Sequence, residues 1–156
     1  MHTSAVPAAL SIEVLPEPLS VCRLAAGAAI PEWAAGAGSF CSVTRTDDEL
    51  SVICATARVP ADTSPAAAQA LMAREDGWRA LKLVGPFAFS EVGVLLRIAA
   101  PLAAAGISIL CVATFDTDYV LVSEARLTTA LAALRAAGHA VIGAELGSGR
   151  TDAPAI

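Results

Sequence analysis

Aromatic residues are scarce in this 156-residue chain, making up 4% of it, whereas hydrophobic residues make up 56%. The core must therefore be built from Ala, Val, Leu and Ile. Long uncharged apolar runs are also missing, because the longest candidate, residues 92–105, contains Arg97 and Pro101. A transmembrane helix needs about 18 or more such residues. The mean hydropathy of +0.64 therefore indicates alanine-rich helices and buried strands, and no membrane partner is expected.

Basic clusters and a secretory signal are absent as well. The net charge is −5 and no block of Lys and Arg occurs, which argues against a nucleic-acid partner. No basic region followed by an apolar stretch begins the chain, so we expect a cytoplasmic protein. The cysteines lie in apolar, strand-like runs without CxxC spacing, which predicts buried, reduced thiols; they are Cys22, Cys41, Cys54 and Cys111.

Metal-binding and catalytic motifs are missing too. His2 and His139 have no second ligand near them in the sequence, so no metal site is expected. No P-loop, GxSxG motif or dinucleotide fingerprint occurs. Glu91 and Asp118 could form a carboxylate pair, but the sequence places no other group to complete an active site. We therefore expect no enzyme activity, no catalytic residues and no cofactor.

The second half of the chain carries the clearest pattern. From Trp78 to Ile142 it reads strand, loop, helix, strand, hairpin, strand, helix and short strand, with two apolar runs around a polar turn at residues 114–118. The first of these helices is predicted to begin near Ser90, a suitable N-cap, and to end at Gly106. Two helical faces are predicted from i, i+3, i+4 and i+7 spacing: Leu95, Ile98, Ala99 and Leu102, and then Leu127, Ala130, Leu131 and Leu134.

The first half contains a weaker version of the same pattern. Thr44 and Asp48 in its hairpin turn correspond to Thr114 and Asp118, which suggests two copies of one unit. The fourth strand of this copy is not obvious, and residues 10–15, a half-buried strand by their alternation, are one candidate for it. Predicted strands cover residues 10–15, 20–24, 40–44 and 50–54, and residues 30–35 form one or two helical turns.

A division of the chain follows from these patterns. The proline-containing stretch at residues 59–65 is the best linker candidate, and residues 66–74 read as helical. We predict a first unit over residues 10–74, a second unit over residues 75–146, and flexible termini at residues 1–9 and 147–156.

Several stretches of the second half resemble the ACT domain, a small βαββαβ regulatory unit that binds amino acids. They are residues 85–87, 90–93, 98–102, 105–108 and 114–122. The resemblance is strongest to the subfamily found in the regulatory part of aspartate kinases, in short bacterial two-domain proteins and in the animal cytosolic arginine sensor. It implies an α+β fold of two ferredoxin-like βαββαβ units, with antiparallel sheets and helices on one face.

The resemblance also implies a ligand site between the loop before the first helix of the second unit and the hairpin. The matching positions are Ser90, Glu91, Val92, Gly93 and Val94 in the loop and helix start, and Thr114, Phe115 and Asp118 in the hairpin. A helix N-terminus suits a carboxylate, whereas Glu91 and Asp118 suit an ammonium or guanidinium group. Two positions depart from the family pattern: Ala113 replaces a serine, and Val92 replaces a small residue.

Structural explanations of the same residues stay open. Asp118 can serve the turn through local hydrogen bonds, and Glu91 can complement the helix dipole. We expect a regulatory protein that binds a small molecule, which the family resemblance implies is an amino acid. It is expected to act as a homodimer through ligand-dependent subunit arrangement and to signal to an unidentified protein partner. The alternative is a structural interaction module without a functional pocket. A polar cavity lined by Glu91 and Asp118 would favour the first interpretation.

Overall fold

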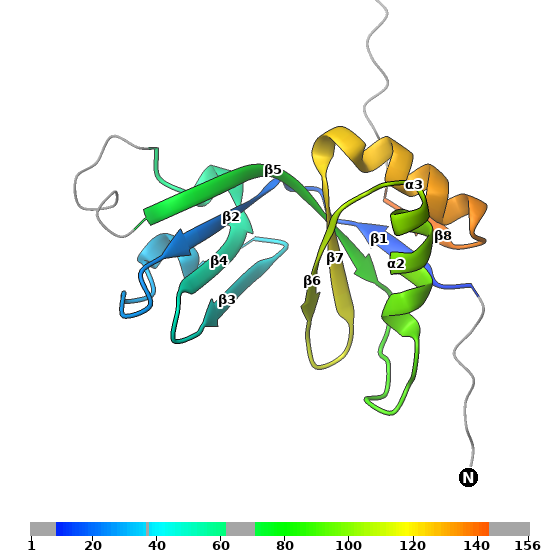
Figure 1. Cartoon of the computed structure of the whole chain (residues 1–156), viewed down its shortest axis with the longest axis horizontal. Coiled ribbons are helices and arrows are strands. Elements are labelled where there is room, and N and C mark those ends of the chain that lie inside the picture. Colours follow the sequence, from blue (N-terminus) through cyan, green and yellow to red (C-terminus); the bar gives the residue numbers. More distant parts are fainter. Residues whose placement is uncertain (1–8, 37, 62–70, 144–156) are drawn as a thin grey trace, which may run out of the picture.

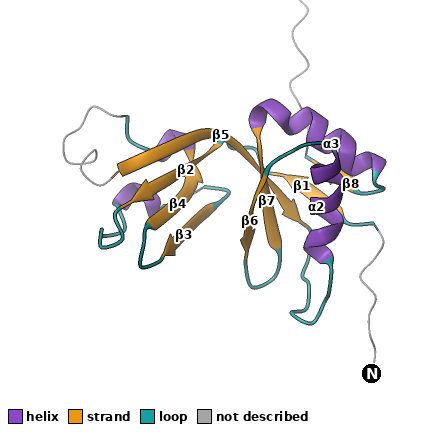
Figure 2. Ribbon diagram, viewed as in Figure 1, coloured by secondary structure: helices purple, strands orange, loops and turns teal. Residues whose placement is uncertain are grey.

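The computed structural model describes residues 9–36, 38–61 and 71–143 (Figures 1 and 2). Its strands are β1 (Ser11–Val14), β2 (Leu19–Leu24), β3 (Cys41–Arg45), β4 (Leu50–Ala55), β5 (Leu71–Leu83), β6 (Ile109–Ala113), β7 (Asp118–Ser123) and β8 (Ala140–Ile142). Its helices are α2 (Val94–Ala104) and α3 (Leu127–Ala136), and short 3₁₀ turns lie at Glu32–Ala34, Thr56–Arg58 and Glu124–Arg126.

One mostly antiparallel sheet contains all of these strands. Its order is β3-β4-β2-β5-β1-β8, with β7 paired to β5 and β6 paired to β7. The long strand β5 joins two halves of the molecule (Figure 1). Its beginning pairs with β2, and its end lies between β1 and β7. The predicted α+β fold of ferredoxin-like units is confirmed, and the two halves of the molecule share this strand.

Two predictions for the first half are wrong, namely the sheet position of the strand at residues 10–15 and the helix that includes residues 71–74. The strand at residues 10–15 does not complete the first unit, because β1 pairs with β5 and β8 in the second half. The fourth strand of the first half is instead the beginning of β5, where Leu24 pairs with Leu71. Residues 71–74 were predicted to be helical, but pairing with β2 overrides their local helix propensity.

Other predictions fall outside the described ranges. These are the rest of the helix predicted at residues 66–74, most of the linker predicted at residues 59–65, and the flexibility of residues 1–8 and 147–156.

The largest core lies between the two helices and one face of the sheet. Both helices lie on this same face (Figure 2). The predicted face of α3 is fully or almost fully buried, and so are Ile98 and Leu102 of α2. Left-handed glycines follow each helix, Gly106 at φ +68° and Gly138 at φ +92°, as expected for helix ends. Within the described ranges, no helix has the length and apolar character to cross a membrane.

A further cluster joins the two halves on the opposite face of the sheet. In it, Phe40 from the first half packs against Tyr119 from β7, with ring centroids 4.8 Å apart. The prediction of four buried thiols is half wrong. Cys22 and Cys54 are buried, but Cys41 and Cys111 are exposed, because β3 and β6 are edge strands with no neighbour on one side.

Candidate functional site

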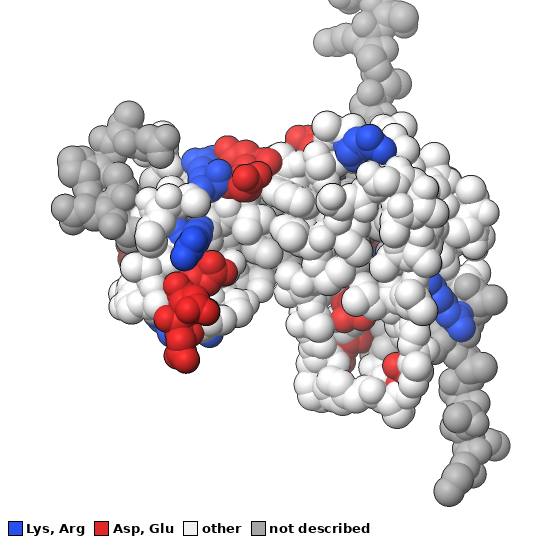
Figure 3. All heavy atoms as spheres, in the orientation of Figure 1, with Lys and Arg blue, Asp and Glu red and all other residues white. Residues whose placement is uncertain are grey.

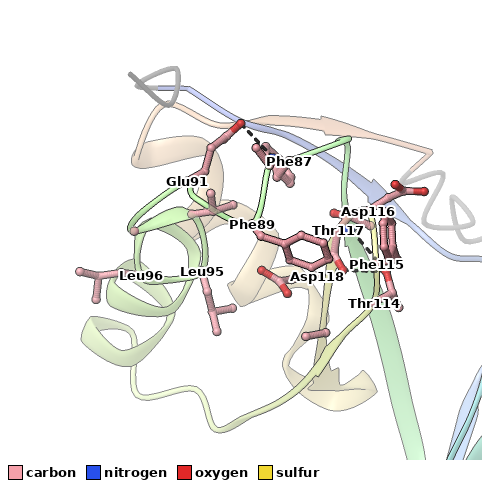
Figure 4. A pocket seen from close by; sticks show the side chains of 14 residues that line it. Phe87, Phe89, Glu91, Leu95, Leu96, Thr114, Phe115, Asp116, Thr117 and Asp118 are labelled. Carbon is pink, nitrogen blue, oxygen red and sulfur yellow. Dashed lines mark hydrogen bonds between the residues drawn. The ribbon is translucent and has the colours of Figure 1, made fainter. Parts of the chain in front are cut away.

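The loop before α2 and the β6–β7 hairpin together form a cavity of about 300 Å³ (Figure 4). It lies at the N-terminal end of α2. Glu91, Asp116 and Asp118 are among its lining residues, whereas no Lys, Arg or His in the described part of the chain lines it. We call it the acidic cavity. Figure 3 shows acidic side chains at this end of the second half, in a surface that is otherwise mostly uncharged.

Backbone contact holds the loop against the hairpin. The Phe87 N–H donates a hydrogen bond to the Asp116 carbonyl at 2.8 Å. Gly85 permits this approach, because a Cβ at that position would lie 2.8 Å from the Asp116 carbonyl oxygen. That distance is shorter than real side chains tolerate, so the loop could not approach as closely with any other residue there.

Two threonines fix the shape of the hairpin turn. The Thr114 hydroxyl donates to the Thr117 carbonyl at 2.8 Å and accepts from the Thr117 N–H at 3.3 Å. The buried Thr117 hydroxyl donates to the Leu83 carbonyl at 2.5 Å, which ties the turn to the end of β5. The predicted ligand residue Thr114 thus lines the cavity but commits its hydroxyl proton to the turn. Thr117 was not predicted as a site residue, although threonine in a polar turn often forms a side-chain hydrogen bond to the backbone.

The two predicted acids do not face each other. Glu91 Oε1 accepts a hydrogen bond from the Ala88 N–H at 3.2 Å, and the Glu91 N–H donates to the Ala88 carbonyl at 2.9 Å. Its carboxylate is turned toward Phe87, whereas that of Asp118 lies between Leu95 and Phe89 (Figure 4). Asp118 is therefore the acid that points into the space beside α2.

The start of α2 differs from the prediction. The helix begins at Val94 after Gly93, which has φ +81° and the left-handed conformation, and no side chain caps it. The predicted N-cap Ser90 is wrong, because the turn at Gly93 delays the helix by several residues. Ser90 and Val92 do not line the cavity, and Val92 is 86% exposed. The other six predicted positions do line it: Glu91, Gly93, Val94, Thr114, Phe115 and Asp118.

Exposed apolar side chains surround the mouth of the cavity. Phe89 from the loop and Phe115 from the hairpin are 79% and 77% exposed, and their rings meet edge to face with centroids 5.0 Å apart. Val92 and Leu96 are exposed nearby on the loop and α2. We call these four residues the apolar rim. Phe89 was not predicted as a site residue, since a lone aromatic residue in a loop has no periodic pattern around it.

The charge of Asp118 reaches a neighbouring thiol. Cys111 is exposed as a residue, but partial desolvation of its thiol, and then the negative charge of Asp118, hold the pKa of Cys111 above its ordinary value. The same charge would favour a cationic group placed in the acidic cavity. Among the described residues, no group of three or more His, Cys, Asp or Glu side chains is arranged to hold a metal ion.

Two family models match the chain. The model for the ACT domain matches residues 73–136, and a model for an N-terminal domain matches residues 17–62. A solved protein from Agrobacterium tumefaciens is 40% identical and has a TM-score of 0.75, over 86% of this chain and 92% of that one.

Aspartate kinases share the fold at low identity. The enzyme from Clostridium acetobutylicum has a TM-score of 0.62 at 11% identity, over 87% of this chain and 36% of that chain. The ligand-free regulatory subunit of aspartate kinase from Thermus thermophilus has a TM-score of 0.53 at 12% identity, over 78% of this chain and 93% of that one.

A short segment is similar to a curated animal protein. The human cytosolic arginine sensor for mTORC1, subunit 1, is 46% identical over 48 residues, which are 30% of this chain and 15% of the sensor. The bovine protein matches to the same extent. The chain thus matches less than a fifth of the length of these relatives.

Proposed function

The chain belongs to the ACT-domain family, and from this premise we propose that it is a regulatory protein whose acidic cavity binds an amino acid. The observation that supports this most directly is the cavity itself. Three acidic residues line it at the junction of the loop and the hairpin, with the Asp118 carboxylate directed into the space beside α2, and no Lys, Arg or His of the described ranges lines it. Its volume of about 300 Å³ is at the small end of the range of ligand pockets, which suits a metabolite of amino-acid size.

The two ends of the ligand would have different partners. Because α2 begins without a side-chain cap, its first N–H groups and its partial positive charge are available to a carboxylate. Asp118 would accept hydrogen bonds from an ammonium or guanidinium group. Glu91 stabilises the loop through Ala88 and adds negative charge near the cavity. We therefore propose that basic or neutral amino acids bind in preference to acidic ones.

The apolar rim supports a homodimer. Phe89 and Phe115 are more than three-quarters exposed, and contiguous apolar surface of this kind usually marks an interface. Symmetric self-association is the commonest way to cover it. In this proposal, ligand bound at the covered mouth favours one subunit arrangement, and a protein partner recognises that arrangement by linkage. The role is non-catalytic and cytoplasmic.

Calorimetric titration with arginine, lysine, glutamate and aspartate tests the charge preference. We expect arginine or lysine to bind more tightly than glutamate or aspartate, because like charges in a partly desolvated site repel by on the order of a few kcal/mol. Asp118→Asn should weaken the binding of the basic ligand. Asp48→Asn, at the corresponding position of the first hairpin, is the matched control and should not. A preference for the acidic pair would refute the site assignment.

The alternative function is a structural interaction module. This alternative is supported by the hydrogen bonds that the Thr114 and Glu91 side chains form with the backbone of the turn and the loop, which are structural roles. A thermal-shift screen of the amino acids separates the two functions, since any ligand that prefers the native state raises its stability. If none of them stabilises the protein, the module is favoured.

A further inference from the structure

A second cavity lies beside the same hairpin. Its volume is about 370 Å³, and it shares Thr114, Asp116 and Thr117 with the acidic cavity. Its remaining lining comes from the end of β5, the start of the loop and Tyr119 of β7. The two cavities thus use one turn as a common wall.

Two side chains of the second cavity, Lys82 and Tyr119, point away from the helices. Lys82 of β5 pairs with Tyr119 of β7, so their side chains lie on the same face of the sheet. The neighbours Leu81 and Leu83 are buried in the core that packs against the helices, so Lys82 and Tyr119 lie on the other face. Figure 4 shows the carboxylate of Asp116 directed away from the acidic cavity, opposite to that of Asp118. The turn therefore offers one acid to each cavity.

Lys82 gives the second cavity a positive charge that the acidic cavity does not have. It is the only lysine in the chain, and within the described ranges it is the only basic residue that lines the second cavity. Its ammonium lies 3.9 Å from Glu13, and the two side chains are 38% and 46% exposed. An ion pair that is this long and this exposed contributes little to stability. Lys82 can therefore turn toward a ligand anion at a small cost in free energy.

Apart from the Tyr119 hydroxyl, the rest of the cavity is apolar or already hydrogen-bonded. Val84, Pro86 and the Tyr119 ring supply apolar surface, and packing against Phe40 holds that ring in place. The Thr114 and Thr117 hydroxyls donate to backbone carbonyls. Charge recognition therefore falls on Lys82 and Asp116, which have opposite signs.

We propose that the second cavity binds a small ω-amino carboxylic acid, with its carboxylate at Lys82 and its ammonium at Asp116. Lys82 pairs with Tyr119 in the sheet, whereas Asp116 precedes Tyr119 by three residues and lies in the turn. A ligand that reaches both must carry its charges several bonds apart. A dicarboxylate would place its second charge against Asp116, which disfavours it. The proposal does not depend on what occupies the acidic cavity.

The single lysine makes a direct test possible. Reductive methylation with ¹³C-formaldehyde labels Lys82 and the N-terminal amine, and methylated lysine keeps its charge. We expect 4-aminobutyrate to shift the Lys82 methyl resonance along a saturable curve, while the N-terminal resonance serves as the internal control. Butyrate should bind more weakly, and succinate more weakly still. A Lys82 resonance that does not move, or moves without saturation, overturns the proposal.

Variants assign the two charges. Lys82→Met should weaken 4-aminobutyrate binding by about tenfold or more in calorimetry, whereas Lys82→Arg should retain most of it. Asp116→Asn should remove the preference for 4-aminobutyrate over butyrate. If binding disappears in Asp118→Asn but persists in Lys82→Met, the ligand occupies the acidic cavity and the second site is refuted.

Discussion

The two acids of the hairpin turn, Asp116 and Asp118, differ in direction although they are only two residues apart. Asp118 begins β7 and faces α2, whereas Asp116 lies in the turn and points to the opposite side (Figure 4). An irregular turn breaks the alternation that would place residues i and i+2 on one face of a strand. Two residues of the same type are thus directed toward two different cavities.

The pKa of Cys111 provides a readout of the charge on Asp118. Burial is the larger cause of the raised thiol pKa and Asp118 the smaller one. Asp118→Asn should therefore lower the pKa of Cys111 partway toward its ordinary value of 9.0. More thiolate is then present at pH 8, and alkylation of Cys111 by iodoacetamide should be faster.

Peptide mass spectrometry measures this alkylation residue by residue. Cys41 is also exposed and lies on β3 in the other half of the molecule, so its rate is the internal control. If Cys111 is alkylated at the same rate in Asp118→Asn as in the wild type, Asp118 does not influence this part of the site.

At the scale of elements, the loop before α2 and the β6–β7 hairpin depend on one close backbone approach. Gly85→Ala would place a methyl group 2.8 Å from the Asp116 carbonyl oxygen and 3.0 Å from the Phe87 nitrogen. Neither backbone atom can yield easily, so the Phe87–Asp116 hydrogen bond should break. We expect a loss of about 1–3 kcal/mol in the free energy of unfolding, together with weaker ligand binding at the acidic cavity.

Urea denaturation and calorimetry measure the two effects separately. Gly27→Ala is the control, because nothing lies within 4 Å of a Cβ at Gly27. Equal stability and equal ligand affinity in wild type and Gly85→Ala would contradict the importance of this approach.

At the scale of the whole molecule, strand β5 and the packing of Phe40 on Tyr119 make the two halves interdependent. The division into units over residues 10–74 and 75–146 remains our proposal for the internal repeat. In the folded chain its boundary falls within β5 (Leu71–Leu83), so a cut there would remove a strand partner from both units.

The apolar rim leads to a prediction about assembly. Phe115→Asp places a charge at the centre of the proposed interface, where an unpaired buried charge is strongly unfavourable. Sedimentation velocity should show a dimer for the wild type and a monomer for the variant. Met72→Asp is the control, because Met72 is 63% exposed but lies at the other end of the molecule. A monomeric wild type, or a dimeric Phe115→Asp variant, would refute the proposed interface.

Local features were determined by the sequence itself. Periodic leucines identified the buried face of α3, glycines marked the ends of both helices at Gly106 and Gly138, and the polar turn identified the hairpin that carries Asp118. These signals depend on residues within about one helical turn or one strand repeat, where backbone sterics and side-chain spacing decide the outcome.

Only the tertiary structure decided the rest. Strand β1 lies between β5 and β8, β5 serves both halves, and Phe89 meets Phe115 across the cavity mouth. Because Gly93 adopts a left-handed conformation, α2 begins at Val94 and not at the predicted Ser90. Strand partners and loop contacts depend on residues far apart in the chain, because pairing and burial override local propensity when the sheet closes.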